Sequence, residues 1–392
     1  MPWVRTAVVI AMLLGACVTP RAQWTEAPGR KLPAGPYSML VGPGTVIVAW
    51  RDPKERAATV IWTSDDGKSG SAKAKYDGDL GAATITQIPI GPVIHYRVMM
   101  HDEQMAAGVL RAGTAPGQTK FRFAVFGDTR TNHQVHRAVI EALAKEDIDF
   151  YLHTGDMVER GGRDDLWTTF FQIERELMEK APIVPAIGNH DLGNRGYYTK
   201  YFFLDKWSNG RSYFVTDWGN VRFVSLDVTI VCEKRCAQYE FVRQALEDGA
   251  AQGKLMVLFM HNPSYSSGAH GSDLQLRAVI SKLCKTYGVE LVVTGHDHDY
   301  ERTKPIDGTT FIVSGSAGAP IQAVNPHPFT ASARTEPHYV LVDVDGDKLT
   351  IRAINLRGEV FDSTVIPNNP PGGSAANDPN AWTSEKAAQV AP

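Results

Sequence analysis

From Phe121 onward, short apolar runs alternate with amphipathic segments, and this alternation limits the class of fold. The apolar runs have the length of buried strands and stand at residues 122–126, 150–153, 183–187, 221–226, 255–260 and 290–293. Apolar residues at helical spacing separate them, and helices are expected near 135–143, 164–179, 238–247 and 273–287. Further strands are expected at 310–313, 339–344 and 349–354. Because strands that alternate with helices pack as a mixed α/β core, residues 119–366 are predicted to form one α/β domain.

Residues 37–118 have a different pattern, which predicts a small all-β sandwich. Runs rich in β-branched and aromatic residues stand at 45–50, 58–62, 83–87 and 93–99, with turn signals between them. No pair of catalytic residue types converges in this stretch, so we interpret it as an accessory domain. After residue 366 the chain is rich in Asn, Pro, Gly, Ser and Ala, and residues 367–392 are predicted to be a disordered tail.

Residues 1–23 have the features of an export signal. Arg5 precedes an apolar run, Thr6–Leu14, that is too short to span a bilayer, and Leu-Gly-Ala-Cys17 follows. Small residues before a cysteine resemble a bacterial lipoprotein signal, in which Cys17 would carry a lipid anchor. The alternative is an ordinary secretory signal that is cleaved nearby. Both predict an exported protein, either a periplasmic lipoprotein or a secreted one, with residues 24–36 as a polar tether.

Charge and cysteine content narrow the partners and the compartment. The formal net charge of -3 over 392 residues gives no basic surface for nucleic acid. An oxidising compartment permits a disulfide between Cys232 and Cys236, which are close enough in sequence to form a small loop. Cys284 stands among apolar residues at helical spacing, and we interpret it as a buried free thiol.

Five of the predicted strands end in residue types that bind metal ions. In chain order these ends carry Asp128, Asp156, Asn189-His190-Asp191, His261, and His296 with His298. A neighbouring glycine lets the backbone turn sharply at the carboxyl end of a strand, where α/β sheets bind their ligands. If the last turn were extended, His296 and His298 would face one point and Asp297 would face away. Because carboxylates and neutral imidazoles bind metal ions, the pattern predicts a metal site at this edge.

These motifs resemble those of the calcineurin-like metallophosphoesterases. They are Gly-Asp, Gly-Asp, Gly-Asn-His-Asp, a strand-end His and Gly-His-x-His, and together they are highly specific. The continuation Asp299–Arg302, and His261–Tyr265 with His270 after it, are similar to the purple acid phosphatase-like branch, in which a fibronectin-III-like domain precedes the catalytic one. The resemblance covers roughly residues 40–366. It implies an αββα sandwich preceded by a small all-β sandwich domain.

The resemblance also implies a two-metal phosphoesterase that hydrolyses phosphate esters through a metal-bound hydroxide. The ligands carried over are Asp128 and His298 for the first metal ion, Asn189, His261 and His296 for the second, and Asp156 as a bridge between both. His190, oriented by Asp191, would contact the phosphate or the leaving group. His270 would protonate the leaving oxygen. The ions would be Fe, Mn or Zn, and the substrate a small phosphate ester.

Two positions depart from the family patterns, and both concern the first metal ion. Arg130 stands where the general family has a histidine, two residues after the first Asp. Glu159 stands where the purple branch has a metal-binding tyrosine. We expect Arg130 to reach for the substrate phosphate, which its forked guanidinium suits. Glu159 is either a replacement ligand or a loop carboxylate that faces solvent.

A second hypothesis comes from a different functional class. The chain could be an inactive phosphate- or glycan-binding surface lipoprotein of the same fold, and Arg130 and Glu159 are the features that favour it. This alternative must explain why the remaining ligand types are all present. A nuclease is disfavoured because the chain lacks a basic face. Monoester, diester and pyrophosphate substrates are not separated by these motifs.

Overall fold

The computed structural model describes residues 31–42, 44–193, 195–230, 236–372 and 381–390. The predicted signal segment with Cys17, and the predicted tether as far as residue 30, lie outside these ranges. Cys232 also lies outside them, so its pairing with Cys236 stays a prediction. Cys284 is a buried free thiol, as expected from its apolar neighbours.

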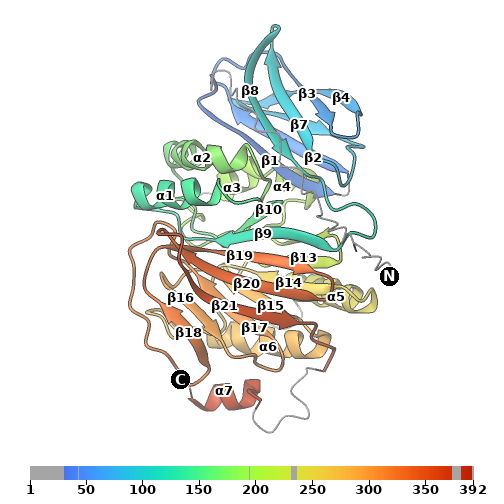
Figure 1. The fold of residues 1–392 in the computed structure, drawn as a ribbon. Coiled ribbons are helices and arrows are strands. Elements are labelled where there is room, and N and C mark those ends of the chain that lie inside the picture. Colours follow the sequence, from blue (N-terminus) through green and yellow to red (C-terminus); the bar gives the residue numbers. More distant parts are fainter. Residues whose placement is uncertain (1–30, 43, 194, 231–235, 373–380, 391–392) are drawn as a thin grey trace, which may run out of the picture.

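The N-terminal part of the chain is a small all-β unit made of two four-stranded antiparallel sheets (Figure 1). Its strands are β1 (Ala34–Gly42), β2 (Thr45–Arg51), β3 (Ala58–Ser64), β4 (Ser69–Lys73), β5 (Lys75–Asp77), β6 (Leu80–Ile85), β7 (Ile94–Met100) and β8 (Glu103–Leu110). The sheet orders are β1-β2-β6-β5 and β4-β3-β7-β8. In β7 every second residue is buried, which is the pattern of a strand with one face on a core. Because β1 begins at Ala34, which is buried, the predicted tether over 24–36 extends too far.

The rest of the chain is built on two mixed sheets, here called the β9 sheet and the β14 sheet. The β9 sheet has the order β11-β10-β9-β19-β20-β21, and the β14 sheet has the order β12-β13-β14-β15-β17-β16-β18. The strands of the β9 sheet are β9 (Lys120–Phe126), β10 (Phe150–His153), β11 (Ile183–Pro185), β19 (His338–Asp345), β20 (Lys348–Asn355) and β21 (Val360–Pro367). Those of the β14 sheet are β12 (Phe214–Trp218), β13 (Val221–Ser225), β14 (Leu255–Phe259), β15 (Leu291–Thr294), β16 (Tyr300–Thr303), β17 (Thr310–Ser314) and β18 (Thr330–Arg334).

The two sheets pack face to face, and helices cover their outer faces (Figure 1). The helices are α1 (His133–Leu143), α2 (Asp164–Met178), α3 (Arg195–Tyr201), α4 (Leu204–Trp207), α5 (Ala237–Ala251), α6 (Leu274–Tyr287) and α7 (Ser384–Val390). Strand β9 shows the reason for the layering. Phe123 and Val125 enter the core between the sheets, whereas Ala124 and Phe126 face the core under α1 and α2. The predicted αββα sandwich is therefore confirmed.

The N-terminal unit packs directly on the α/β domain. The ring of Tyr37 in β1 stacks on Phe171 in α2 with a centroid separation of 4.4 Å. Arg51 at the end of β2 donates to both carboxylate oxygens of Asp164, at 3.0 and 2.8 Å. Because Tyr37 and Met39 belong to the same buried cluster as the helices, the two units share a core along this contact.

The prediction of a disordered tail over 367–392 is wrong for the part that the structure describes. Helix α7 lies near the C-terminus, with Ala387 fully buried. The backbone N–H of Asp307 donates to the carbonyl of Trp382, and the Ser384 N–H donates to the Asp307 carboxylate. The polar composition of the tail gave no sign of these few ordered residues, which pack against the loop between β16 and β17.

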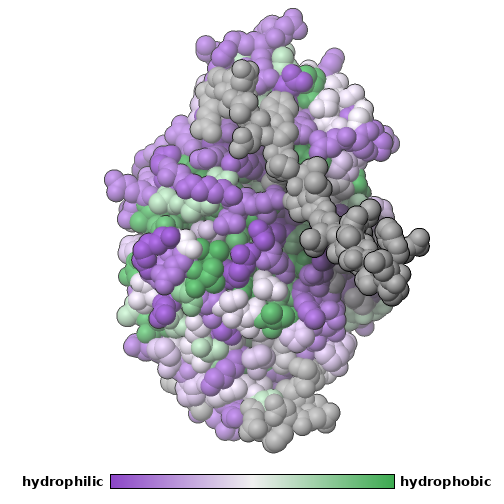
Figure 2. Space-filling model, in the orientation of Figure 1, coloured by the Kyte–Doolittle hydropathy of each residue, from purple (hydrophilic) through white to green (hydrophobic). Residues whose placement is uncertain are grey.

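The visible surface of the molecule is mixed in polarity. The face in Figure 2 is hydrophilic over most of the N-terminal unit, and the apolar patches lower down are interrupted by polar side chains. Among the helices that the structure describes, none combines the length and the apolar character that crossing a membrane requires.

Candidate metal centre

The carboxyl ends of five parallel strands bring the predicted metal ligands to one edge of the sandwich. Strands β9, β10 and β11 of the β9 sheet lead into Asp128, Asp156 and Asn189, and strands β14 and β15 of the β14 sheet lead into His261, His296 and His298. Three of these residues have left-handed backbones, with φ of 56° at Asp128, 54° at Asp156 and 71° at His296. Such conformations are costly for residues other than glycine and cluster at functional sites.

Glycine is required where these loops approach one another. A Cβ on Gly188 would lie 2.2 Å from both the backbone nitrogen and the Oδ1 of Asp156. A Cβ on Gly295 would lie 2.2 Å from Oδ2 of Asp128. The Gly-Asp, Gly-Asn-His and Gly-His motifs therefore exist because no side chain fits between the converging loops.

Four side chains converge on one point, and we call Asp156, Asn189, His261 and His296 the second-metal group. Nε2 of His261 lies 3.3 Å from Oδ1 of Asp156, 3.1 Å from Oδ1 of Asn189 and 3.3 Å from Nδ1 of His296. Nδ1 of His261 contacts the carbonyl of Thr154 at 2.9 Å, which leaves Nε2 to face the group. Oxygen and imidazole nitrogen donors at these separations fit a transition-metal ion.

The charge of this group favours a cation. Burial opposes the charged form of His261, but the carboxylates of Asp156 and Asp128 outweigh it and raise the pKa of His261 to about 9. Burial and the neighbouring His261 lower the pKa of His296 to about 3, so that its imidazole is neutral at pH 7. A neutral imidazole is the form that binds a metal ion.

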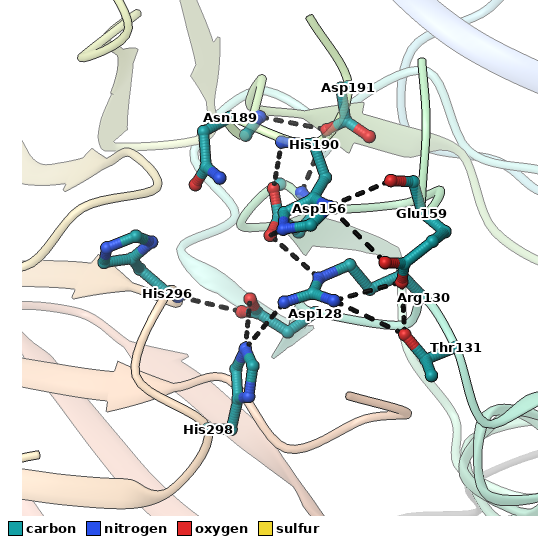
Figure 3. A network of polar contacts seen from close by, with 12 residues as sticks. Asp128, Arg130, Thr131, Asp156, Glu159, Asn189, His190, Asp191, His296 and His298 are labelled. Atoms are coloured by element: carbon teal, nitrogen blue, oxygen red, sulfur yellow. Dashed lines mark hydrogen bonds and ion pairs between the residues drawn. The ribbon is translucent and has the colours of Figure 1, made fainter. Parts of the chain in front are cut away.

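The remaining predicted ligands form a second set, and we call Asp128, Asp156 and His298 the first-metal group (Figure 3). Oδ1 of Asp128 is buried, has no hydrogen-bond partner among the described residues, and lies 3.6 Å from Nε2 of His298. Asp128 and Asp156 also lie close to His261 of the second-metal group, since one ligand atom of each of the three lies within 4.8 Å of the others. An unpartnered buried carboxylate oxygen is expected where a cation belongs, so these residues fit a metal ion.

The two residues that depart from the family patterns meet beside the first-metal group. Nε of Arg130 donates to Oδ2 of Asp156 at 3.1 Å, and Nη1 donates to Oε2 of Glu159 at 3.0 Å. Nη2 of Arg130 lies 3.4 Å from Nε2 of His298. Figure 3 shows the guanidinium between these three side chains. Glu159 is thus paired with Arg130, although its side chain is also partly exposed to solvent.

The expected contact between His190 and Asp191 is not formed, and this part of the prediction is wrong. Nδ1 of His190 contacts the carbonyl of Glu159 at 2.9 Å, so a backbone group orients the ring. The carboxylate of Asp191 turns inward and accepts four backbone N–H groups, from Gly188, Asp156, Met157 and Val158, at 2.9 to 3.2 Å. Asp191 therefore ties the loop after β10 to the loop after β11.

Replacing Asp191 by Asn tests this structural role. An amide has one acceptor oxygen, so two of the four backbone N–H groups would face an NH₂ group and lose their partner. We expect Asp191→Asn to lower the free energy of unfolding by about 2–4 kcal/mol, since each unsatisfied buried group costs roughly 1–3 kcal/mol. Urea unfolding measures the change. Asp165→Asn, at an exposed ion pair on α2, is the matched control and should change stability by less than about 0.5 kcal/mol. Equal stability of Asp191→Asn and the wild type would refute the role.

His270 lies beside the metal groups, and its partner is Asp297, which the sequence interpretation expected to face away. Asp297 accepts from the backbone N–H of His270 at 2.7 Å and contacts its Nδ1 at 2.9 Å. The His270 ring centroid lies 4.4 Å from that of His296. The assumption of an extended turn was wrong because His296 is left-handed, and Asp297 consequently points towards His270. The sequence signal for this contact was the position of an acidic residue, Asp297, between the two candidate ligand histidines.

Sequence reasoning also missed the loop that follows β17. The carbonyl of Pro320 contacts Nδ1 of His298 at 2.8 Å, and Oε1 of Gln322 accepts the His298 N–H at 3.2 Å. The N–H of Ala319 donates to the carbonyl of Asp128 at 2.7 Å. This loop therefore holds His298 with Nε2 towards Asp128. The run Gly315-Ser-Ala-Gly-Ala-Pro320 after a predicted strand was its only sequence signal.

Comparison with known proteins agrees with the fold and the arrangement of these loops. The family model of the calcineurin-like phosphoesterases matches residues 121–300, which include all of β9 except its first residue, the elements from there to β15, and every predicted metal ligand. Residues 121–300 therefore resemble a calcineurin-like phosphoesterase domain. The calcineurin-like domain is accompanied here by the small all-β unit described above.

Purple acid phosphatases are among the relatives of this chain. It is 26% identical over 241 residues to purple acid phosphatase 21 of Arabidopsis thaliana, which corresponds to 57% of this chain and 54% of that protein. It is 25% identical over 265 residues to a nucleotide pyrophosphatase/phosphodiesterase of Hordeum vulgare, or 53% of this chain and 72% of that protein. The match thus spans only about half the length of purple acid phosphatase 21.

A solved structure extends the likeness beyond the calcineurin-like domain. The purple acid phosphatase PPD1 from yellow lupin (Lupinus luteus) seeds superposes with a TM-score of 0.75 at 19% identity. The superposition covers 86% of this chain and 75% of that one. It supports the mixed α/β fold preceded by a small all-β unit.

Proposed function

We propose that this protein is a metal-dependent hydrolase of phosphate esters. The observation that carries the proposal is the convergence of six ligand side chains from five strand ends, with donor atoms of the second-metal group 3.1 to 3.3 Å apart. A dimetal centre is what the purple acid phosphatase-like fold implies, and the donor set of carboxylate, amide and imidazole suits Fe, Mn or Zn. The phosphoesterase family suggests a small phosphate ester as substrate.

Asp156 is proposed to join the two metal positions. Its Oδ1 lies 3.3 Å from Nε2 of His261, and its Oδ2 accepts from Arg130, which also lies beside His298, so that each oxygen would serve one side. When bound, two metal ions would supply Lewis acidity for the phosphoryl group and lower the pKa of a bound water towards neutrality. The chain contributes the orientation of its ligands, through Thr154, Pro320 and the backbone N–H groups that hold each carboxylate.

The remaining residues are proposed to handle the phosphate and the leaving group. His190 has Nε2 4.0 Å from Oδ2 of Asp156, with its other ring nitrogen on the Glu159 carbonyl, so Nε2 is available to the substrate. His270 is proposed as the general acid, because Asp297 holds Nδ1 and leaves Nε2 for proton transfer. Arg130 is proposed to contact the phosphate, for which a planar guanidinium is suited.

The substrate is proposed to be a phosphate monoester or diester, and the protein is proposed to be exported. The relatives include a phosphatase and a nucleotide pyrophosphatase/phosphodiesterase by name, so both monoesters and diesters are to be tested. Export, as a periplasmic lipoprotein anchored through Cys17 or as a secreted protein, is proposed on the sequence of residues 1–23. The assignment of the all-β unit to fibronectin type III is likewise a proposal.

The test is hydrolysis of 4-nitrophenyl phosphate and bis(4-nitrophenyl) phosphate by protein that has been stripped of metal and reloaded with Mn²⁺, Zn²⁺ or Fe. The proposal expects hydrolysis of at least one substrate that depends on added metal. Failure of every metal to restore hydrolysis, with fewer than one ion bound per chain, would favour the alternative of an inactive phosphate- or glycan-binding protein. Metal content and activity are therefore measured on the same samples.

A further inference from the structure

Arg130 contacts donor atoms that a metal ion in the first-metal group would need. Nδ1 of His298 is on the Pro320 carbonyl, so Nε2 holds the free lone pair, and Nη2 of Arg130 lies 3.4 Å from it. Nε of Arg130 donates to Oδ2 of Asp156, the residue proposed to serve both metal positions. A guanidinium carries one positive charge and several donors, so it can satisfy the same acceptors as a cation.

The guanidinium is held in this position by its surroundings. The Arg130 side chain is only 13% exposed, and Nη1 donates to Glu159 at 3.0 Å. Thr131, which also contacts the Glu159 carboxylate, has a φ of 75°, which is unusual for a β-branched residue. A strained residue is retained where the surrounding contacts determine it. Thr131 and Glu159 thus form a fixed support on the far side of Arg130 (Figure 3).

The second-metal group has no comparable competitor. Its donor atoms on Asn189, His261 and His296 contact one another at 3.1 and 3.3 Å, and none of them is hydrogen-bonded to a basic side chain in the described structure other than histidine. Only Asp156 is shared, and it uses its other oxygen for Arg130. The two positions therefore differ in whether a basic side chain from outside the ligand set lies against their ligand atoms.

We propose that the Arg130 guanidinium competes with a metal ion for the first-metal group, so that the two metal positions load unequally. The second position binds its ion tightly, and the first binds only when Arg130 moves away from Asp156 and His298. Displaced from these acceptors, Arg130 keeps Glu159 as its partner and lies at the edge where a phosphate would enter. This inference rests on the metal centre proposed above, but metal binding is measured without substrate, so the two can fail separately.

The experiment is a titration of the metal-free full-length protein with Mn²⁺ alone, followed by equilibrium dialysis with elemental analysis and by electron paramagnetic resonance. The wild type is expected to bind one ion at least about 100-fold more tightly than the other, since outer partners alone change metal affinity by roughly 10- to 100-fold. Its spectrum should show isolated Mn²⁺ until the weaker position fills, and only then an exchange-coupled pair. Two ions bound with equal affinity by the wild type would overturn the proposal.

Two variants separate competition from the mere lack of a ligand. Arg130→Gln removes the guanidinium without adding an imidazole, and competition predicts that the first position then tightens by about 10-fold or more. If the missing histidine were the only cause, Arg130→Gln would leave the first position unchanged, and the proposal would be wrong. Arg130→His removes the competitor and adds the usual family ligand, so it should reduce the difference in Mn²⁺ affinity between the two positions further.

The control variant replaces an exposed arginine outside the metal groups. Arg163→His, at an exposed ion pair with Asp165, should bind Mn²⁺ like the wild type. Thermal unfolding checks that each variant is folded, and if Arg130→Gln does not fold, Arg130→Ala takes its place, because it also removes the guanidinium without adding an imidazole. Unequal loading that Arg130→Gln relieves, without hydrolysis of any ester, would support this inference while refuting the proposed function. Hydrolysis by a wild type that binds its two metal ions with equal affinity would support the proposed function and refute this inference.

Discussion

Asp156→Asn is expected to lower kcat/KM for aryl phosphates by at least about 10³-fold. Asp156 is the proposed bridge between the two metal positions, and an amide offers one oxygen without charge in place of two charged ones. Bound metal ions are expected to supply several kcal/mol of transition-state stabilisation, and each 1.36 kcal/mol corresponds to a factor of ten in rate. Steady-state kinetics on metal-reloaded protein measures the loss. The Mn²⁺ content of the same samples should fall at both positions.

The control for this prediction is a carboxylate far from the centre. Asp345 is exposed at the end of β19 and pairs with Lys120, so Asp345→Asn removes the same charge without touching a ligand. It should keep wild-type kinetics and metal content. Thermal unfolding establishes whether Asp156→Asn is still folded at the assay temperature. Wild-type activity in a folded Asp156→Asn variant would show that catalysis does not depend on the proposed bridge.

His270→Asn is expected to reduce kcat in a way that depends on the leaving group. General acids contribute roughly 10²- to 10⁴-fold when the leaving oxygen needs a proton. We therefore expect a loss of at least about 10²-fold with phenyl phosphate, and a much smaller loss with 4-nitrophenyl phosphate, whose phenolate leaves without help. Parallel kinetics on the two esters measure the difference. A residue with only a structural role would lower both rates alike.

His101→Asn provides the matched control for His270. His101 is exposed on the turn between β7 and β8 with a φ of 47°, a conformation that asparagine tolerates well. This variant should hydrolyse both esters at the wild-type rate. Equal losses on the two esters in His270→Asn would assign His270 to packing or metal positioning and would remove it as the general acid.

Much of the architecture could be predicted because local pattern and tertiary environment agree. In β9 the alternation of Phe123 and Val125 with Ala124 and Phe126 serves two cores on opposite faces, which requires an apolar run bounded by polar ends. The candidate metal ligands could be located for a related reason. Each follows a strand whose carboxyl end lies at the same edge, so chain order alone placed Asp128, Asp156 and His261 together.

The contacts inside the site could not be predicted because they depend on backbone conformations and on distant partners. The left-handed backbone at His296 turned Asp297 towards His270, which an extended turn would not do. Asp191 neighbours His190 in sequence, but four backbone N–H groups compete for its carboxylate more effectively than one imidazole. The surroundings of Arg130 come from loops after β10 and β15, and no local pattern describes them.

The origin of the ligands in both sheets has a consequence for how the protein is held together. Asp128, Asp156 and Asn189 follow strands of the β9 sheet, whereas His261, His296 and His298 follow strands of the β14 sheet. An ion bound between them would link the two halves of the sandwich much as a cross-link does. Since a ligand that binds only the native state stabilises it in proportion to RT ln(1 + [L]/Kd), the resistance of this protein to heat and proteases should follow the free metal concentration of its compartment.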